Sequence, residues 1–435
     1  MHIILSLILS LFLTSVLAVN AAGNDNARMN VSALLKTSAE QLTSTSLGSN
    51  LTLYKSTTSQ HGFALILGEG DNSRVIAYSA DATLDPNSDN PSFKWWINAV
   101  KKISAQRAST LATTKPDPAR FPLNVDPLLT TKWGQREPFK FMCPFDTYVE
   151  DSSLYGTYTP NMGHYSVGCT ATAMAQYMNY YKFPQHGVGQ DSVTVSYTVG
   201  LNNVDVVYKV DFEHATYDWA NMIDDYQGEY TAEQGQAVAQ LCYHCGVAAQ
   251  SLYNHYGAGS TDAKCLEAFI THFNYNDTAR YIVRSNYTEP QWMEQVYTML
   301  SNNHPILYSG KDINLELGII AGHNFIIDGY DQNGLVHVNW GWYGLEDGFF
   351  DIALLNPQQY TYDDWQAMYI GLYPNQVANP CDVNRDGSVT SADITIIYNY
   401  LLTGDQTYLS TSDVNGDGSV TSSDITSIYN ILLGN

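Results

Sequence analysis

The chain has 435 residues, enough for two to four units that each bury a core. Its 43 acidic and 20 basic side chains give a formal charge of −23, which argues against binding to nucleic acid, because phosphate recognition needs clustered Lys and Arg. Only 14% of the residues are charged and 12% are aromatic, so the acidity belongs to a folded chain and not to a disordered acidic tail.

Residues 1–22 are predicted to form a signal peptide. Met1–Leu13 is an apolar run too short for a membrane span, and small residues suited to signal-peptidase cleavage follow it. A retained anchor is the alternative. No later run reaches the roughly 20 apolar residues that a membrane helix needs. We therefore expect a secreted or cell-surface-associated protein without a transmembrane span.

The N-terminal segment, residues 23–118, predicts a small α+β unit. Short strands are expected at 51–54, 62–67 and 74–78, and apolar residues recur at helical spacing from Phe93 to Ile103. This segment has a charge of +1 against −18 for residues 119–380, so charge attraction would help it to dock. Alternatively, its lysines only solvate a helix face. Three prolines within 113–122 predict an extended, accessible processing site.

The main domain, residues 119–378, contains no low-complexity interruption. Its strongest predicted helix is Cys169–Tyr181, which Pro184 stops. Its strongest strand pair is 324–330 and 335–342, joined by Asp331-Gln-Asn-Gly334, and Asn-Gly is a hairpin signal because both residues tolerate positive φ.

Cys242 and Cys245 are spaced like half of a zinc site. No matching second pair exists, and residues 231–248 are predicted to be a helix. We therefore interpret the two residues as buried helical thiols.

Cys169 is a candidate nucleophile because it opens a helix directly after Gly168. A thiol there faces unpaired backbone N–H groups and the positive end of the helix, which favour the attacking thiolate. The glycine would let a substrate backbone approach closely. A cysteine at a helix start is also typical of a buried structural thiol.

The partner of such a thiol would be a histidine held by a polar group on another element. His323 opens the first hairpin strand, and if the hairpin folds about Gln332, residues whose numbers sum to about 664 face each other. Residues 339–342 would then lie across from His323 and could orient or shield its ring. We interpret His337 as a structural residue within a strand and His164 as a loop residue without a partner.

Several motifs resemble those of the streptopain-type cysteine peptidases, in the same order along the chain. They lie at 133–139, 168–184, 322–329 and 337–350, within a resemblance that extends from about residue 45 to 375. The segment 256–260 is similar to a stretch that lines the substrate cleft of that family.

The resemblance implies an α+β fold, with a papain-like domain made of a helical half and an antiparallel β half. It makes Cys169 the nucleophile and His323 the general base and then acid. Gln135, with the backbone N–H of Cys169, would hold the oxyanion. Asn339 and Trp340 fall at the positions that support the histidine, and which of them orients it stays open. The N-terminal segment resembles the family's inhibitory propeptide. No catalytic metal is implied.

The C-terminal module, residues 379–435, contains a repeat within its last 55 residues. Asp382-Val-Asn-Arg-Asp-Gly recurs 31 residues later as Asp413-Val-Asn-Gly-Asp-Gly, and each copy leads into an apolar helix. Oxygen-bearing side chains at positions 1, 3, 5, 9 and 12, a backbone carbonyl at position 7 and glycine at position 6 predict two calcium loops. Because the carboxylates repel each other without metal, folding should require calcium. The expected ligands are Asp382, Asn384, Asp386, Ser388, Thr390 and Asp393, then Asp413, Asn415, Asp417, Ser419, Thr421 and Asp424.

The duplicated loop and helix resemble a dockerin, an all-α calcium-binding module. The resemblance implies a cohesin-like partner, and a calcium cap that only stabilises the C-terminus is the alternative. Together the motifs predict a secreted cysteine endopeptidase made as a zymogen, acting on protein or peptide substrates. Two rivals are a docking protein whose papain-like domain no longer cleaves and an enzyme acting on a non-protein amide.

Overall fold

This computed structural model describes most of the chain from residue 26 to 433, and the predicted signal peptide lies outside the described residues. The described ranges are 26–48, 50–59, 61–68, 73–88, 90–105, 114–145, 163–199, 201–254, 257–314, 319–352, 365–375, 381–384, 389–415 and 417–433. None of the helices in these ranges is long and apolar enough to cross a membrane.

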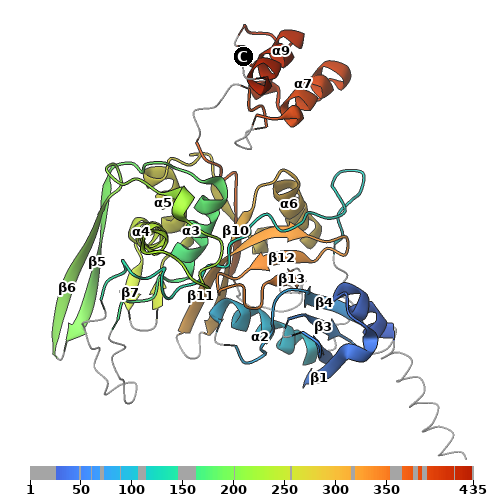
Figure 1. The fold of residues 1–435 in the computed structure, drawn as a ribbon, viewed down its shortest axis with the longest axis vertical. Coiled ribbons are helices and arrows are strands. Elements are labelled where there is room, and N and C mark those ends of the chain that lie inside the picture. The colour runs from blue at the N-terminus through green and yellow to red at the C-terminus, as the bar shows by residue number, and fades with distance from the viewer. Residues whose placement is uncertain are drawn as a thin grey trace, which may run out of the picture.

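A ten-stranded antiparallel sheet joins the N-terminal segment to the main domain (Figure 1). The strand order is β1-β2-β3-β4-β13-β12-β11-β10-β14-β9, so the first four strands of the chain extend the sheet of the main domain. The strands are β1 (Leu42–Gly48), β2 (Leu51–Ser56), β3 (Phe63–Leu67), β4 (Arg74–Ser79), β9 (Arg280–Val283), β10 (Ile306–Asn314), β11 (Ile319–Tyr330), β12 (Val336–Asn339), β13 (Gly348–Phe350) and β14 (Trp365–Ile370).

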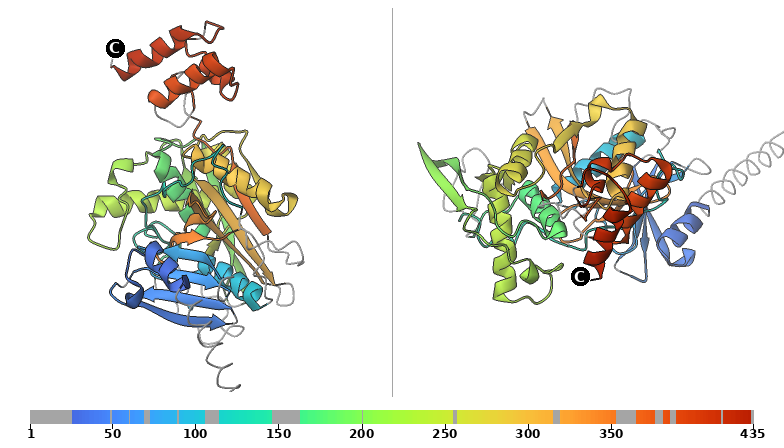
Figure 2. Two further views of the ribbon diagram at one scale, coloured as in Figure 1. Left: turned by 90° about the vertical axis from the view of Figure 1, so that its right-hand side faces the viewer. Right: turned by 90° about the horizontal axis from the view of Figure 1, so that it is seen from above.

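Helices cover both faces of this sheet and make two hydrophobic cores (Figure 2). On one face α3, α4 and α5 pack with β11 through Ile326, and on the other α2 and α6 pack with it through Phe325 and Ile327. Two hairpins complete the helical half. These elements are α2 (Pro91–Ala105), α3 (Cys169–Tyr181), α4 (Ala232–Ala248), α5 (Asp262–His272), α6 (Glu289–Ser301), and the pairs β5 (Gln190–Val199) with β6 (Asn202–Asp211) and β7 (Leu252–Asn254) with β8 (Gly257–Gly259).

The helices of the helical half begin and end where the local sequence predicts. Helix α3 follows Gly168 at φ 86° and ends at Lys182, which takes the left-handed conformation at φ 50°. Helix α4 begins with a capping box in which Thr231 and Gln234 bond each other's backbone N–H groups.

Cys242 and Cys245 are completely buried within α4, as predicted. All six cysteines lie in described residues, and none of them forms a disulfide.

The predicted hairpin of β11 and β12 forms with a small shift in register, but β12 ends at Asn339, so residues 340–342 do not pair across from His323 as expected. Ile326 faces Asn339 and Ile327 faces Val338, so the paired numbers sum to 665, and a bulge before Gly329 moves the last pairs by one more residue. Of the turn residues only Gly334 takes a positive φ, of 84°, because the Asp331 carboxylate caps the turn by accepting the N–H groups of Asn333 and Leu335.

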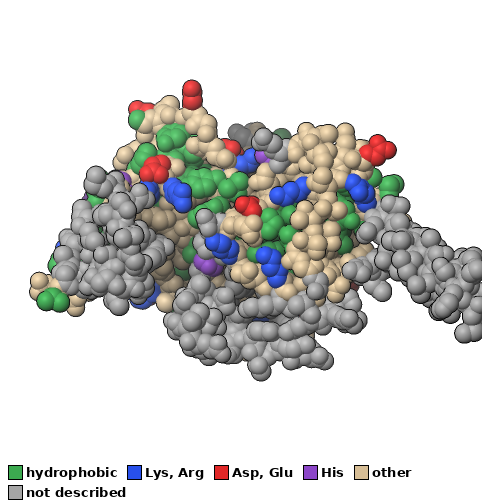
Figure 3. Space-filling view, turned by 90° about the horizontal axis from the view of Figure 1, so that it is seen from below, with side chains coloured by type: hydrophobic (Ala, Val, Ile, Leu, Met, Phe, Trp, Pro, Cys, Tyr) green, Lys and Arg blue, Asp and Glu red, His purple; other side chains and the backbone are tan. Residues whose placement is uncertain are grey.

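The N-terminal segment joins the main domain through strand pairing and a buried ion pair. Phe349 of β13 faces Tyr78 of β4 and their rings stack at 5.0 Å. The guanidinium of Arg74 lies 2.8 Å from the Asp351 carboxylate, whose side chain is 1% exposed. The ion pair described at this junction comes from Arg74. Figure 3 shows further Lys and Arg side chains spread over the end of the molecule opposite the C-terminal module.

The C-terminal module folds around a small core of its own, and Figures 1 and 2 show it apart from the sheet. Its helices are α7 (Ser391–Thr403), α8 (Leu409–Ser412) and α9 (Ser422–Leu432). The two long helices fall where the repeat predicts them. Ile397 and Ile428, at equivalent positions of the two copies, are completely buried in the shared core.

Candidate active site

The first residue of α3 meets the strand that carries His323. The Cys169 sulfur accepts a hydrogen bond from the backbone N–H of Asn324, the residue directly after His323. The sequence separates these residues by more than 150 positions, and the packing of α3 against β11 brings them together.

Gly168 is required by the protein's own backbone. A Cβ at this position would lie 2.1 Å from the carbonyl oxygen of Ala258 in β8, and φ is 86°. β8 therefore occupies the space that a side chain at position 168 would need. The short strand lies directly beside the start of α3.

Burial opposes the thiolate form that the helix position of Cys169 favours. Burial raises the pKa of this thiol, and the N–H groups of Asn324, Thr170 and Cys169 itself lower it only in part. Burial also lowers the pKa of His323 to about 4. Desolvation therefore favours a neutral thiol and a neutral imidazole in this state of the chain.

His323 belongs to β11, one face of which packs with α2 of the N-terminal segment. Successive strand residues point to opposite faces, so His323 shares a face with Phe325. The Phe325 ring packs at 4.8 Å from Trp340, which in turn meets Phe93 of α2 at 6.3 Å. The Nδ1 atom of His323 is buried and has no hydrogen-bond partner among the described residues.

Gln135 lies beside the segment that leads into Cys169. Its backbone carbonyl accepts the N–H of Val167 at 3.1 Å, and its side-chain carbonyl accepts the hydroxyl of Ser166 at 3.4 Å. The amide oxygen of Gln135 thus accepts a hydrogen bond from Ser166, while the amide NH₂ group is the donor that the proposed oxyanion role requires. The loop that carries Gln135 is therefore bonded two and three residues before the thiol.

Asn339 connects the two halves of the domain. Its amide oxygen accepts Nε2–H of Gln176 on α3 at 3.1 Å and the N–H of Gly341 at 3.0 Å, and its amide group donates to the Thr131 carbonyl at 2.7 Å. These contacts hold α3 against β12, and none of them reaches His323.

Trp340 is buried behind the strand, and its indole N–H donates to the Glu346 carbonyl at 3.0 Å. Neither Trp340 nor Asn339 has a described hydrogen bond to His323, so the residue that orients the ring is not identified by contact.

The two competing histidines have other partners. His337 Nδ1 lies 2.6 Å from the carboxylate of Asp328, which is completely buried. Although burial lowers the pKa of His337, the Asp328 charge raises it above the ordinary value. His164 bonds the Cys143 carbonyl, and its ring packs on Phe145 at 4.0 Å.

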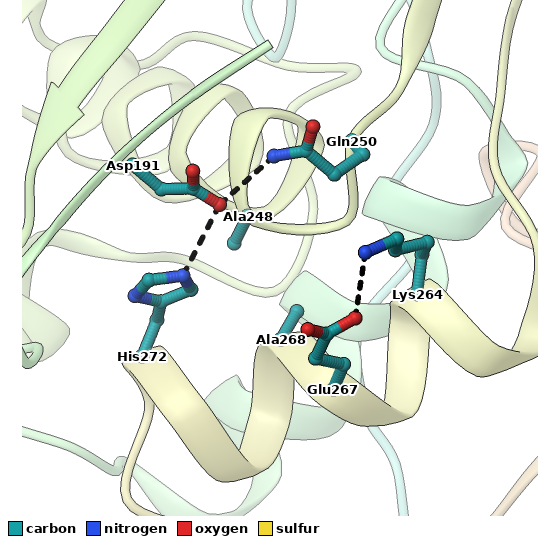
Figure 4. Close-up of a pocket in the computed structure, with 7 residues that line it drawn as sticks. All are labelled: Asp191, Ala248, Gln250, Lys264, Glu267, Ala268 and His272. Carbon is teal, nitrogen blue, oxygen red and sulfur yellow. Dashed lines mark hydrogen bonds and ion pairs between the residues drawn. The ribbon is translucent and has the colours of Figure 1, made fainter.

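A polar hollow between β5, α4 and α5 lies apart from these residues (Figure 4). Its groups pair among themselves: Asp191 accepts from Gln250 at 2.8 Å and lies 3.2 Å from His272, and Lys264 pairs with Glu267 at 2.7 Å. None of the predicted site residues lines it.

Parts of the two predicted calcium loops have the geometry expected for a cation that binds oxygen ligands. In the second loop Gly418, at position 6, has φ 87°, which the sharp turn requires. The carboxylates of Asp393 and Asp424 are completely buried, and each accepts backbone N–H groups from the start of its own loop. Asp386 and Ser388 lie outside the described residues. Within those that are described, no three His, Cys, Asp or Glu side chains gather closely enough to hold a metal.

Comparisons with known proteins match both the domain and the module. Residues 133–350 match the model of the Peptidase C10 family, and residues 380–433 match that of the Dockerin type I domain. The chain belongs to the Peptidase C10 family. It is therefore a cysteine peptidase, and its α+β fold with a dockerin at the C-terminus is confirmed. The dockerin type I match also supports calcium binding.

Relatives of this peptidase come from several bacteria. Streptopain of Streptococcus pyogenes serotype M28 is 27% identical over 345 residues, which are 75% of this chain and 81% of streptopain. The thiol protease/hemagglutinin PrtT of Porphyromonas gingivalis is 26% identical over 311 residues, 68% of this chain and 33% of PrtT.

Two solved structures of interpain A from Prevotella intermedia are similar to the peptidase. A prointerpain A fragment with a cysteine-to-alanine substitution is 37% identical with a TM-score of 0.64. The match covers 77% of this chain and 98% of the fragment. The active wild-type protease is 40% identical with a TM-score of 0.50. The match covers 60% of this chain and 99% of the protease chain in that structure. The proform thus matches more of the chain than the active form does.

Proposed function

We propose that this chain is the zymogen of a secreted cysteine endopeptidase in which Cys169 and His323 cleave peptide bonds. The observation that carries the proposal is the hydrogen bond from the Asn324 N–H to the Cys169 sulfur, because it joins the start of α3 to the strand of His323. Gln135 supports it, since its loop is bonded to residues 166 and 167 beside the thiol.

In the active form, the imidazole takes the proton of the thiol and the thiolate attacks the substrate carbonyl carbon. The carbonyl oxygen becomes an oxyanion, held by the Gln135 amide and the Cys169 N–H, a kind of donor worth about 3 kcal/mol of barrier each. The C–N bond then breaks, and the imidazolium gives its proton to the leaving amine. Water, activated by the neutral imidazole, hydrolyses the thioester and restores the thiol.

Asn339 and Trp340 support this chemistry from behind. Asn339 fixes the distance between α3 and β12 through its bonds to Gln176 and Thr131. Trp340 packs on Phe325, which lies two residues after His323 on the same face of β11. This contact keeps water from that side of the strand.

The latent state follows from the position of the N-terminal segment. The neutral thiol and imidazole, and a His323 side chain directed to the covered face, describe an unreactive pair. Release of the segment would expose the imidazole and return its pKa toward 6.5, and a change in the backbone of β11 at His323 would then let the ring reach the sulfur.

Contacts of residues 122–129 support a boundary near residue 118 and processing before Pro122. The Tyr330 hydroxyl donates to the Pro122 carbonyl at 2.9 Å, and Leu129 donates to the Asp328 carboxylate at 2.9 Å. These residues belong to the hairpin's packing and would stay with the mature enzyme. We accordingly assign 1–22 as signal peptide, 23–118 as propeptide, 119–378 as peptidase domain and 379–435 as docking module.

The C-terminal module would hold two structural calcium ions through the loop oxygens that begin at Asp382 and Asp413. Calcium there would neutralise the carboxylates and fix each loop before its helix. The module would then bind a cohesin-like partner and attach the secreted enzyme to a surface or a larger assembly. No part of the peptide cleavage involves this metal.

The test is the intact mass of the secreted wild-type chain and of Cys169→Ala followed over time. We expect the wild type alone to shorten to a start between residues 110 and 121 and then to digest an unfolded protein substrate. His323→Ala should behave like Cys169→Ala. The matched control is His214→Ala, because this histidine is exposed and pairs with Asp211 far from the site. Shortening of Cys169→Ala on its own, or a wild type that never shortens or digests protein, would refute the proposal.

A further inference from the structure

The loop that carries Gln135 rests on the side chain of Tyr343. The ring lies directly over Gly134: a Cβ on this glycine would come within 2.3 Å of the Tyr343 Cζ atom. The Tyr343 hydroxyl accepts the backbone N–H of Arg136 at 2.6 Å. Ring and hydroxyl therefore touch the residues on both sides of Gln135.

Tyr343 is itself held in place by the backbone on either side. Its N–H donates to the Trp133 carbonyl at 3.0 Å, and its carbonyl accepts Nε2–H of Gln227 at 2.9 Å. Its φ is 60°, a left-handed conformation that is unfavourable for a bulky residue. Such a conformation persists only where surrounding contacts fix it, and here those contacts come from the Gln135 loop and from Gln227.

The Gln135 loop is thus clamped between two elements. On one side, Val167 and Ser166 bond Gln135 itself just before the thiol. On the other side, Tyr343 extends from the loop after β12, four residues beyond Asn339. Burial raises the pKa of Tyr343 and the backbone N–H groups of Arg136 and Gln135 partly offset it, which agrees with a neutral hydroxyl that accepts these N–H groups.

We infer that Tyr343 is a positioning residue of the oxyanion hole, which fixes the amide of Gln135 by holding the backbone of its loop. The inference rests on the proposed role of Gln135. A donor placed by a rigid loop stabilises the oxyanion without rearranging during the reaction, and a loosened loop loses that benefit while substrate still binds. Tyr343 acts through Gln135 and has no assigned contact with the reacting atoms.

The test compares four forms of the processed enzyme: wild type, Tyr343→Phe, Gln135→Ala and the double variant. Tyr343→Phe keeps the ring on Gly134 and removes only the hydroxyl, so the loop stays folded. Four quantities are measured for each form, namely kcat and KM on a peptide amide, the rate of Cys169 alkylation by iodoacetamide, and the melting temperature. Alkylation consumes the thiolate by displacement of iodide and forms no oxyanion, so it reports on the thiol–imidazole pair alone.

We expect Gln135→Ala to lower kcat by about 10²–10³-fold. Tyr343→Phe should lower kcat about tenfold, as for the loss of one backbone hydrogen bond, with KM and the alkylation rate changed by less than about twofold. The double variant should match Gln135→Ala alone, because Tyr343 has nothing left to position.

The outcomes separate the inference from the proposed function. If Gln135→Ala loses kcat but Tyr343→Phe does not, or if the two losses multiply in the double variant, Tyr343 does not act through Gln135. If Tyr343→Phe slows alkylation as much as hydrolysis, its role is general and structural. If Gln135→Ala keeps full kcat, Gln135 is not an oxyanion donor and the proposed mechanism fails together with the inference.

Discussion

The N-terminal segment and the C-terminal module meet the peptidase domain in different ways. The segment shares the ten-stranded sheet, and its Trp96 lies in the same hydrophobic core as Phe350 of β13, with ring centroids 4.8 Å apart. The module has a core drawn from its own residues, and its described link to the domain is a hydrogen bond from Tyr408 to Asn302 at 3.2 Å. A unit that shares a core can regulate the domain, whereas a unit with its own core can be exchanged or lost without harming it.

The largest effect should come from removing calcium from the full-length chain. Without the ion, the carboxylates of each loop repel one another, and so small a core cannot hold the module folded alone. We expect EGTA to abolish the helical circular-dichroism signal of the module while the peptidase rate and the main thermal transition stay unchanged. A chain that ends at residue 378 is the control and should show no response. Loss of peptidase activity together with the module would contradict the comparison.

The next effect should come from Arg74→Ala in the Cys169→Ala chain. This substitution leaves the buried Asp351 carboxylate without its ion pair and should weaken docking of the N-terminal segment by about 3 kcal/mol. Trace active enzyme should then remove the segment on the order of a hundredfold faster, as followed by intact mass.

Lys264→Ala is the matched control, because its ion pair with Glu267 is exposed on both sides, lies outside the cleaved segment and is worth about 0–1 kcal/mol. Equal processing rates for the two variants would show that the shared sheet edge does not depend on the Arg74–Asp351 pair.

The smallest effect should come from Tyr408→Phe, which removes the hydrogen bond between the module and Asn302, directly after α6. We expect the melting temperatures of both units to stay the same, within about 0.5 kcal/mol of unfolding free energy. A larger change in the main transition, measured by differential scanning calorimetry, would mean that the module is coupled to the peptidase domain after all.

The elements that the sequence predicts best are those with local signals. Helix α3 lies where Gly168 and Pro184 bound an apolar run, and the tail helices follow the repeat. The β11–β12 hairpin was predicted from its Asn-Gly turn. The paired residue numbers sum to one or two more than the expected 664, because the Asp331 side chain caps the turn and a bulge follows it. Neither feature follows from residue types.

What the sequence did not predict depends on contacts between distant residues. The pairing of β4 with β13 joins segments about 270 residues apart, and the sequence of neither strand indicates which strand it pairs with. The same is true of Tyr343 and Gly134. The helix position of Cys169 and a neighbouring imidazolium favour its thiolate, whereas burial raises the pKa of this thiol, and that burial depends on residues distant in the sequence.

The central claim is that the Cys169 thiol is neutral while the N-terminal segment is bound and becomes an ion pair with His323 once the segment leaves. It is tested by treating a partly processed wild-type sample with iodoacetamide at several pH values. Intact mass separates the full-length and processed forms, and peptide mapping assigns the label to Cys169.

At pH 5 we expect Cys169 in the processed form to react at least about a hundredfold faster, because an imidazolium-paired thiolate persists to low pH. In the full-length form the rate should rise about tenfold per pH unit toward pH 9, since its pKa is raised above 9.0 and higher pH removes the proton. Equal labelling of the two forms at pH 5 would contradict the account.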